Sequence, residues 1–240
     1  MEFLANLNWI AVGQIVLIDI LLGGDNAIVI ALACRNLPVK LRMKGIVWGT
    51  VGAIAIRIAL IAFAVTMLEL PYLKLAGGLL LLWIGVKLLN EDDEHAEVGG
   101  SDRLWGAVRT VIVADLVMSL DNVIAIASAA EQAGQNQMAL VVFGIVVSIP
   151  IIVWGSTLVL KLMEKFPVII TLGAALLGYI AGGMIFNDAG VQAHLQGFIA
   201  DTEFVLPGAQ AHLSLPGLVG AIGVVLVGLR LKRGKQQNQS

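Results

Sequence analysis

Long apolar stretches alternate with short polar segments along most of the chain. A transmembrane helix needs about 20 mostly apolar residues to cross the hydrocarbon core of a bilayer. Stretches of roughly this length occur at about residues 8–34, 45–68, 72–90, 107–130, 138–160, 167–186 and 215–231. The pattern therefore predicts an all-α, polytopic membrane protein with seven transmembrane helices, which form a single transmembrane domain over residues 1–240.

Composition supports this prediction and excludes several classes of protein. Hydrophobic residues make up 58% of the chain and charged residues only 13%, whereas a soluble domain carries about 25% charged residues. The single cysteine, Cys34, excludes an intramolecular disulfide and a metal site built from several thiolates. Because no phosphate-binding loop, nucleophile elbow, zinc-protease motif or extended basic patch is present, we expect neither an enzyme nor a nucleic-acid-binding protein.

The basic residues predict how the helices are oriented. Of the 15 Lys and Arg residues, all but Arg57 and Lys74 lie in or beside the first, third and fifth loops and the C-terminal tail. With seven helices these segments fall on one side of the membrane, and short basic segments stay in the cytoplasm. We therefore predict a bacterial cytoplasmic-membrane protein with its N-terminus outside and its C-terminus in the cytoplasm.

An acidic phrase occurs twice within the apolar stretches. Residues 19–31 read DILLGGDNAIVIA, and residues 115–127 read DLVMSLDNVIAIA, at an offset of 96 residues. The same offset relates Pro71 to Pro167, and Gly77 to Gly173. Carboxylates inside a membrane cost roughly 2.5–3.5 kcal/mol each on insertion scales, so they are candidates for function.

The repeat predicts the architecture. Helices one to three recur as helices four to six, and an odd number of crossings makes the second copy run in the opposite sense. Inverted repeats of this kind underlie many secondary transporters, which bind their substrate near the midplane where the two repeats meet. We predict a 3+3 inverted repeat, with repeat one at 8–90, repeat two at 107–186 and an extra C-terminal helix at 215–231.

The oxygen-bearing side chains of the two copies are candidate metal ligands. They are Asp19, Asp25, Asn26, Asp115, Asp121 and Asn122. In each copy the first Asp and the Asn share one helix face, whereas the second Asp points about 120° away unless the chain unwinds. An all-oxygen set suits Mn²⁺, Ca²⁺ or Mg²⁺ rather than Zn²⁺ or Cu⁺. The alternative is a structural hydrogen-bond network between helices.

Several neighbours are accessory candidates with two interpretations each. Met118 is either a softer ligand or core filler, and Ser119 stands where the first copy has Gly23. Arg57 either neutralises one carboxylate or extends its charge toward the interface. Gly23 and Gly24 either interrupt the first helix or permit close helix packing.

Charge counting predicts the transport mechanism. Four ionised Asp side chains around one divalent ion leave an excess of negative charge in a medium of low dielectric constant, so some of them are expected to carry protons. We expect metal binding to displace these protons, and no cofactor is expected beyond the transported ion. The acidic segments 91–102 and 187–214 are either metal-collecting loops or solvated loops and surface helices.

The doubled Asp-Asn motif, at 25–26 and 121–122, resembles the TerC family of integral membrane proteins, which is similar to the LysE-type exporter superfamily. The resemblance covers about residues 8–232 and is greatest to the short bacterial YjbE/YkoY-like branch, described as metal transport proteins. It implies Mn²⁺ export through the six ligand candidates. The sequence Ser119-Leu120 before the second Asp-Asn pair is nearer to the family pattern than Gly23-Gly24 before the first, so the two halves of the site differ.

Two functions follow from this reasoning. The first is a secondary transporter that exports a divalent cation, most simply Mn²⁺, with the lipid bilayer as its surroundings and a homo-oligomer left open. The alternative is a non-transporting membrane factor for tellurium-type stress resistance or membrane-protein assembly. Export of an amino acid is disfavoured, because a zwitterion needs a cationic partner and Arg57 is the only basic residue deep within a predicted helix.

Overall fold

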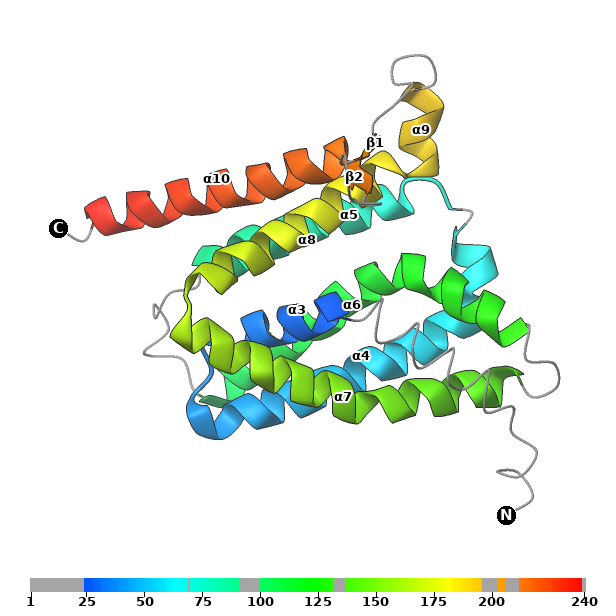
Figure 1. The fold of residues 1–240 in the computed structure, drawn as a ribbon, viewed down its shortest axis with the longest axis horizontal. Coiled ribbons are helices and arrows are strands. Elements are labelled where there is room, and N and C mark those ends of the chain that lie inside the picture. The colour runs from blue at the N-terminus through cyan, green and yellow to red at the C-terminus, as the bar shows by residue number, and fades with distance from the viewer. Residues whose placement is uncertain are drawn as a thin grey trace. The chain divides into compact units, whose positions relative to one another are not determined.

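The computed structural model describes residues 24–68, 70–90, 100–131, 137–195, 203–205 and 212–238, and these are mostly helical (Figure 1). The helices are α3 (Gly24–Cys34), α4 (Val39–Leu68), α5 (Leu73–Asn90), α6 (Gly100–Glu131), α7 (Gln137–Lys165), α8 (Val168–Phe186), α9 (Ala189–Leu195) and α10 (Leu215–Asn238). Two short strands, β1 (Glu203–Val205) and β2 (His212–Ser214), pair antiparallel and depart from the all-α prediction.

The helices lie where the apolar pattern places them. Among the described residues, five segments are long and apolar enough to cross a membrane: Val39–Leu60, Leu73–Asn90, Val142–Lys165, Val168–Phe186 and Leu215–Lys232. The first predicted helix is described only from Gly24 onward, as α3, and the fourth corresponds to α6. The protein is therefore an integral membrane protein with several apolar helices, and seven crossings stay a prediction.

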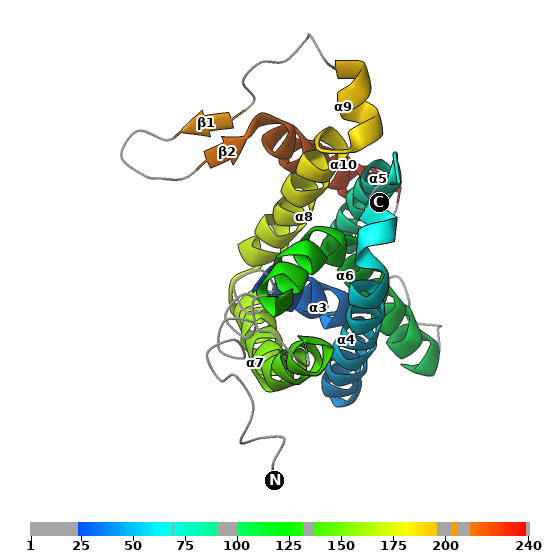
Figure 2. The ribbon, with the colours of Figure 1, turned by 90° about the vertical axis from the view of Figure 1, so that its right-hand side faces the viewer.

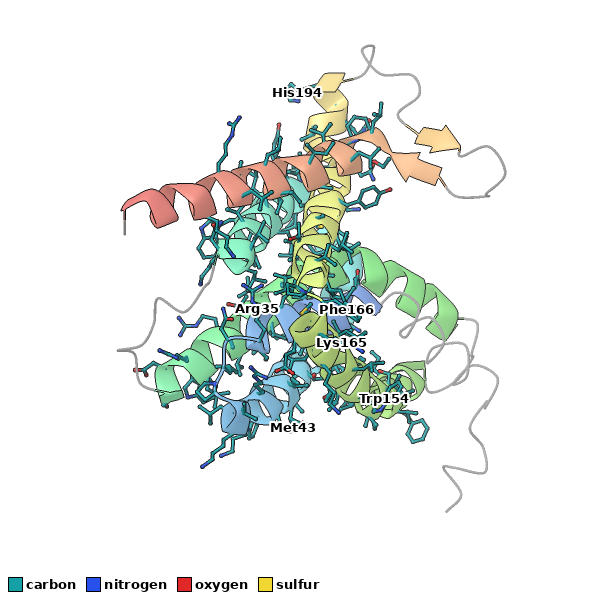
Figure 3. All side chains as sticks on the ribbon, turned by 60° about the vertical axis from the view of Figure 1, so that its left-hand side comes forward. Arg35, Met43, Trp154, Lys165, Phe166 and His194 are labelled. Carbon is teal, nitrogen blue, oxygen red and sulfur yellow. The ribbon has the colours of Figure 1, made fainter. Side chains whose placement is uncertain are left out.

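Large apolar side chains cover the outside of these helices. Trp48, Trp83, Trp105 and Trp154 are each more than half exposed. Figure 3 shows Met43 and Trp154 directed away from the neighbouring helices. Exposed apolar surface on this scale is a liability in water, but it is the surface that acyl chains cover in a bilayer. The exposed faces therefore fit a lipid setting.

The chain divides into two compact units, and each takes helices from both predicted repeats. Unit 1 contains residues 1–65 and 98–161, and unit 2 contains residues 66–97 and 162–240. The boundary after residue 65 and the boundary after residue 161 are 96 residues apart, which is the offset of the acidic phrase. Both repeats are thus divided at the same internal position.

In unit 1, glycines let α4 approach α6 closely. A Cβ atom at Gly49 would lie 3.0 Å from Val111, and one at Gly52 would lie 2.5 Å from Ile112. The contact further along α4 also lies further along α6, so the two helices run parallel.

The orientation of α3 follows from a similar contact at its other end. Gly45, near the start of α4, faces Cys34 at the end of α3 and Leu104 near the start of α6. Consequently α3 runs antiparallel to both helices, and its first residues lie level with their later turns. Figure 2 shows α3 among α4, α6 and α7.

In unit 2, α5, α8 and α10 lie side by side (Figure 1). The closest approach joins α8 to α10, where a Cβ atom at Gly182 would overlap the carbonyl group of Pro216. Leu89, Ala174 and Val224, one from each helix, form a buried apolar cluster. Small residues permit such close packing of helices in membranes, where packing replaces the hydrophobic effect.

The contacts between α5 and α8 have an internal symmetry. A Cβ atom at Gly78 would lie 2.8 Å from the carbonyl oxygen of Ala181, and one at Gly85 would lie 3.5 Å from that of Ala174. Gly78 and Ala174 are 96 residues apart, and so are Gly85 and Ala181. Each residue of the first contact is therefore the repeat equivalent of a residue in the second contact, with the helices exchanged. A twofold axis between antiparallel helices produces such a pair of contacts.

Asp188 fastens the turn before α5 to the start of α9. Its carboxylate accepts hydrogen bonds from the backbone N–H groups of Tyr72 (3.0 Å), Leu75 (3.2 Å), Gly190 (2.8 Å) and Val191 (3.2 Å). It therefore caps two helices at once. Tyr72 has a φ of 66°, a left-handed conformation that is costly for a residue with a Cβ atom, and the bond to Asp188 helps to hold it.

Candidate functional site

A cluster of buried polar and charged side chains lies in unit 1. Arg57, on α4, is only 1% exposed. Asp115 and Ser119, one turn apart on α6, are also buried. The parallel packing of α4 against α6 through Gly49 and Gly52 brings the two helices close enough for these side chains to meet.

The three side chains form a closed ring of polar contacts. Nη2 of Arg57 lies 2.5 Å from Oδ1 of Asp115. Nε of Arg57 donates to Oγ of Ser119 (3.0 Å), and that hydroxyl donates to Oδ2 of Asp115 (3.0 Å). Both carboxylate oxygens are therefore engaged. Charge-assisted bonds of this kind are the strong ones, and the contact corresponds to the first of the two interpretations of Arg57, in which it neutralises one carboxylate.

Asp25 and Asn26 stand at the start of α3, close to this ring. Asp25 interacts electrostatically with both the guanidinium of Arg57 and the carboxylate of Asp115. Its Oδ1 accepts the backbone N–H of Asn26 at 2.8 Å. The antiparallel course of α3 thus carries the Asp-Asn pair of the first copy to the Asp of the second copy.

The Asn26 side chain is buried without satisfying its own polar atoms. It is 3% exposed, and neither its amide oxygen nor its amide nitrogen has a hydrogen-bond partner among the described residues. The hydroxyl of Thr50 on α4 is in the same condition. An unsatisfied buried polar group costs about 1–3 kcal/mol. A buried, unsatisfied amide that follows Asp25 directly in the chain therefore fits an oxygen ligand for a cation better than a packing residue.

The structure tests only part of the predicted ligand set. Asp19 and Gly23 lie outside the described residues. Asp121 and Asn122 lie on α6, which is helical there, but their side chains are outside the described part. Within the described part of the chain, no three His, Cys, Asp or Glu side chains gather as a metal cluster. The convergence of six ligands stays a prediction, supported by Asp25, Asn26 and Asp115.

The accessory candidates have different surroundings. Ser119 belongs to the ring, and Arg57 pairs instead of extending to the interface. Met118 is buried on α6, which fits core filler and leaves a ligand role as a prediction. Sequence reasoning missed Thr50. Its signal is its spacing, because it lies seven residues before Arg57 and so on the same face of α4.

The charges at this place have a simple balance. The described groups are one permanent cation, Arg57, and two carboxylates, Asp25 and Asp115. With both carboxylates ionised, they leave one negative charge in surroundings of low dielectric constant. Two carboxylates and an amide oxygen are hard ligands of the kind that Mn²⁺, Mg²⁺ and Ca²⁺ bind. These donors therefore suit a divalent cation.

The fold and this place together define a multi-pass helical membrane protein with a buried charged centre between α3, α4 and α6. The family model of the integral membrane protein TerC family matches residues 4–236. The chain therefore belongs to the TerC family.

Its relatives are membrane proteins of bacteria. The uncharacterized membrane protein YjbE of Bacillus subtilis is 48% identical over 72% of this chain and 78% of its own length. YkoY of the same organism is 24% identical over 90% of this chain and 70% of its own. The inner membrane protein YgdQ of Escherichia coli is 27% identical over 66% of this chain and 73% of its own. No solved structure matches the chain.

Proposed function

We propose that the protein exports a divalent metal cation, most simply Mn²⁺, from the cytoplasm as a secondary transporter. The observation that carries this proposal is the buried, unsatisfied amide of Asn26, which directly follows Asp25, the carboxylate that interacts with Arg57 and Asp115. Oxygen ligands buried at a helix junction inside an apolar protein offer what a hard cation needs after it loses its water. The remaining candidates, Asp19, Asp121 and Asn122, are proposed to complete the ligand set.

The proposed architecture has seven crossings arranged as a 3+3 inverted repeat with one extra helix, α10. Three observations support it: the symmetric contacts between α5 and α8, the equal division of both repeats at residues 65 and 161, and the parallel course of α4 and α6. Parallel α4 and α6 are what alternating crossings give for helices two and four. Together with the basic loops, this supports an N-terminus outside and a C-terminus in the cytoplasm.

We further propose that protons move against the metal ion. Support comes from the charge balance, because a full set of four ionised Asp side chains exceeds the charge of one divalent ion and Arg57 together. If protons moved in the opposite direction, the charge of the centre would stay near neutrality both when it holds the metal ion and when it does not. Metal uptake by everted vesicles should then dissipate an imposed proton gradient, and uptake that leaves the gradient undisturbed would remove this part of the proposal.

The export proposal is tested by cellular Mn content after Mn²⁺ challenge in cells with and without the protein. Asp25→Asn keeps the shape of the side chain but removes its charge, so we expect cells to accumulate Mn as if the protein were absent. Glu164→Gln makes the equivalent change at an exposed position on α7 and should behave as wild type. The amount of each variant protein in the membrane is measured in the same cells.

The competing hypothesis is a non-transporting membrane factor for stress resistance or membrane-protein assembly. It predicts equal Mn content in all strains, with any effect of Asp25→Asn explained by a loss of folded protein. Equal Mn content with normal amounts of both variants would therefore reject export and favour this alternative.

A further inference from the structure

Arg57 carries a permanent positive charge in the interior of unit 1. It is 1% exposed and lies within Val39–Leu60, a segment that is long and apolar enough to cross a membrane. A guanidinium stays protonated in proteins, unlike a lysine amine or a carboxyl group. A permanent cation at such a position is costly unless an anion accompanies it at all times.

The ring around Arg57 withholds Asp115 from any other cation. Oδ1 of Asp115 is held by the guanidinium at 2.5 Å, and Oδ2 by the hydroxyl of Ser119 at 3.0 Å. Asp25 is close enough to interact electrostatically with Arg57 and Asp115, and the oxygen of the next residue, Asn26, has no hydrogen-bond partner among the described residues. Asp115 is thus already paired with a cation, while the Asn26 oxygen close by in the chain is still unsatisfied.

Building on the proposed transport function, we propose that Arg57 is a tethered cation: it occupies Asp115 while the protein holds no metal ion, and it gives way when a divalent ion binds between Asp25 and Asp115. Arg57 is then a positioning residue that determines which ions bind, not a ligand. Displacement is needed because a divalent ion and a guanidinium on the same carboxylate repel each other.

A tethered cation discriminates by ionic charge. Na⁺ and K⁺ carry the same single charge as Arg57, must lose their own hydration, and compete with a group whose attachment gives it a high effective concentration. A divalent ion interacts twice as strongly with each carboxylate, so it can repay the loss of the Arg57–Asp115 contact. Arg57 would therefore exclude monovalent cations and help to expel the metal ion at release, when it returns to Asp115.

A purely structural role of Arg57 predicts something else. If the ring only joined α4 to α6, loss of the guanidinium would loosen the helices and leave ion affinity equal or weaker. The tethered-cation proposal predicts the opposite sign, since removing the competitor should strengthen ion binding even while stability falls. The sign of the change in affinity therefore separates the two roles.

The experiment measures Mn²⁺ binding by titration calorimetry to the purified full chain in lipid nanodiscs, in sodium chloride and in choline chloride. We expect Arg57→Gln to bind Mn²⁺ at least about tenfold tighter than wild type in choline, and to lose part of this gain in sodium. Arg57→Lys keeps a tethered charge and should stay near wild type and insensitive to sodium. Arg42→Gln removes a charge from the same helix, where the side chain donates to the Leu37 carbonyl, and serves as the control.

Equal or weaker Mn²⁺ binding by folded Arg57→Gln overturns the inference, whereas wild-type protein that binds no Mn²⁺ overturns the proposed function beneath it. If Arg57→Gln does not fold, Asp115→Asn is compared with the double variant Arg57→Gln/Asp115→Asn, which removes both charges of the Arg57–Asp115 ion pair. The inference expects the double variant to bind more tightly, because the single variant retains a repelling guanidinium beside Asp25. Equal affinities of the two would contradict it.

Discussion

Replacing Asp188 by Asn should loosen the start of α5 in a way that can be measured at single amides. In the native protein Oδ2 of Asp188 accepts the N–H of Leu75 at 3.2 Å, while Oδ1 accepts those of Tyr72, Gly190 and Val191. An asparagine can keep its oxygen at the Oδ1 position, but its NH₂ group then faces the Leu75 N–H, donor against donor. One charge-assisted bond is lost and the other three lose their charge.

The loss of one bond to a charged group is worth about 2 kcal/mol, so the Leu75 amide should exchange with solvent roughly 30-fold faster. Hydrogen exchange at neutral pH, resolved for the peptide that covers residues 72–75, measures this directly. Asp102→Asn, on the exposed start of α6, is the control. Unchanged protection of the Leu75 amide in Asp188→Asn would refute the assigned role of this carboxylate.

The pH dependence of the same protection gives a second test. Burial raises the pKa of Asp188, but the backbone N–H groups of Leu75, Val191, Tyr72 and Gly190 outweigh this and lower the pKa below its ordinary value of 3.8. Since the folded-state pKa is the lower one, the stabilisation is complete above about pH 4 and is lost as the pH falls through the folded-state pKa. Protection that already falls between about pH 5 and 6 would contradict this assignment.

Two further substitutions test the packing and the ring. Gly182→Ala places a Cβ atom onto the carbonyl group of Pro216 and should lower the unfolding free energy by about 1–3 kcal/mol. Gly183→Ala, with open space around it, should not lower it. Thermal unfolding in detergent compares the two variants, and equal stabilities would reject the close approach of α8 to α10. Ser119→Ala should cost about 1–2 kcal/mol more than Ser156→Ala, whose hydroxyl contacts only its own helix; equal losses would remove Ser119 from the ring.

The apolar stretches locate the helices, but they do not give the residues at which the helices begin and end. The stretch predicted to start at residue 45 belongs to a helix that begins at Val39, and the one predicted from residue 107 belongs to α6, which begins at Gly100. The added turns carry charged side chains such as Arg103. A helix continues into water as long as its backbone bonds continue, but its apolar pattern stops at the interface, so the pattern misses these turns.

The pairing of Arg57 could be predicted because it is the only basic residue deep in a predicted helix, and a buried guanidinium requires a carboxylate. The identity of its partner could not, since the parallel packing of α4 and α6 selects Asp115. The role of Asp188 could not be predicted either, because two of the four N–H groups that donate to it, those of Tyr72 and Leu75, come from a turn more than a hundred residues earlier. The short strands β1 and β2 lie in a segment whose composition predicted only a loop or surface helix.

The ring also shows how far the two halves of the motif differ chemically. Asp19 is the counterpart of Asp115, and at the offset of 96 residues Gly23 stands where the second copy has Ser119. The counterpart of Arg57 is Val153, or Ile152 if the repeat slips by one residue there, and both are apolar. A doubled acidic motif is thus served by a single guanidinium. Asp115 is paired with an arginine of the other repeat, whereas the corresponding position for Asp19, in repeat two, is apolar. This asymmetry fits a centre in which one arginine, and not two, competes with the cation.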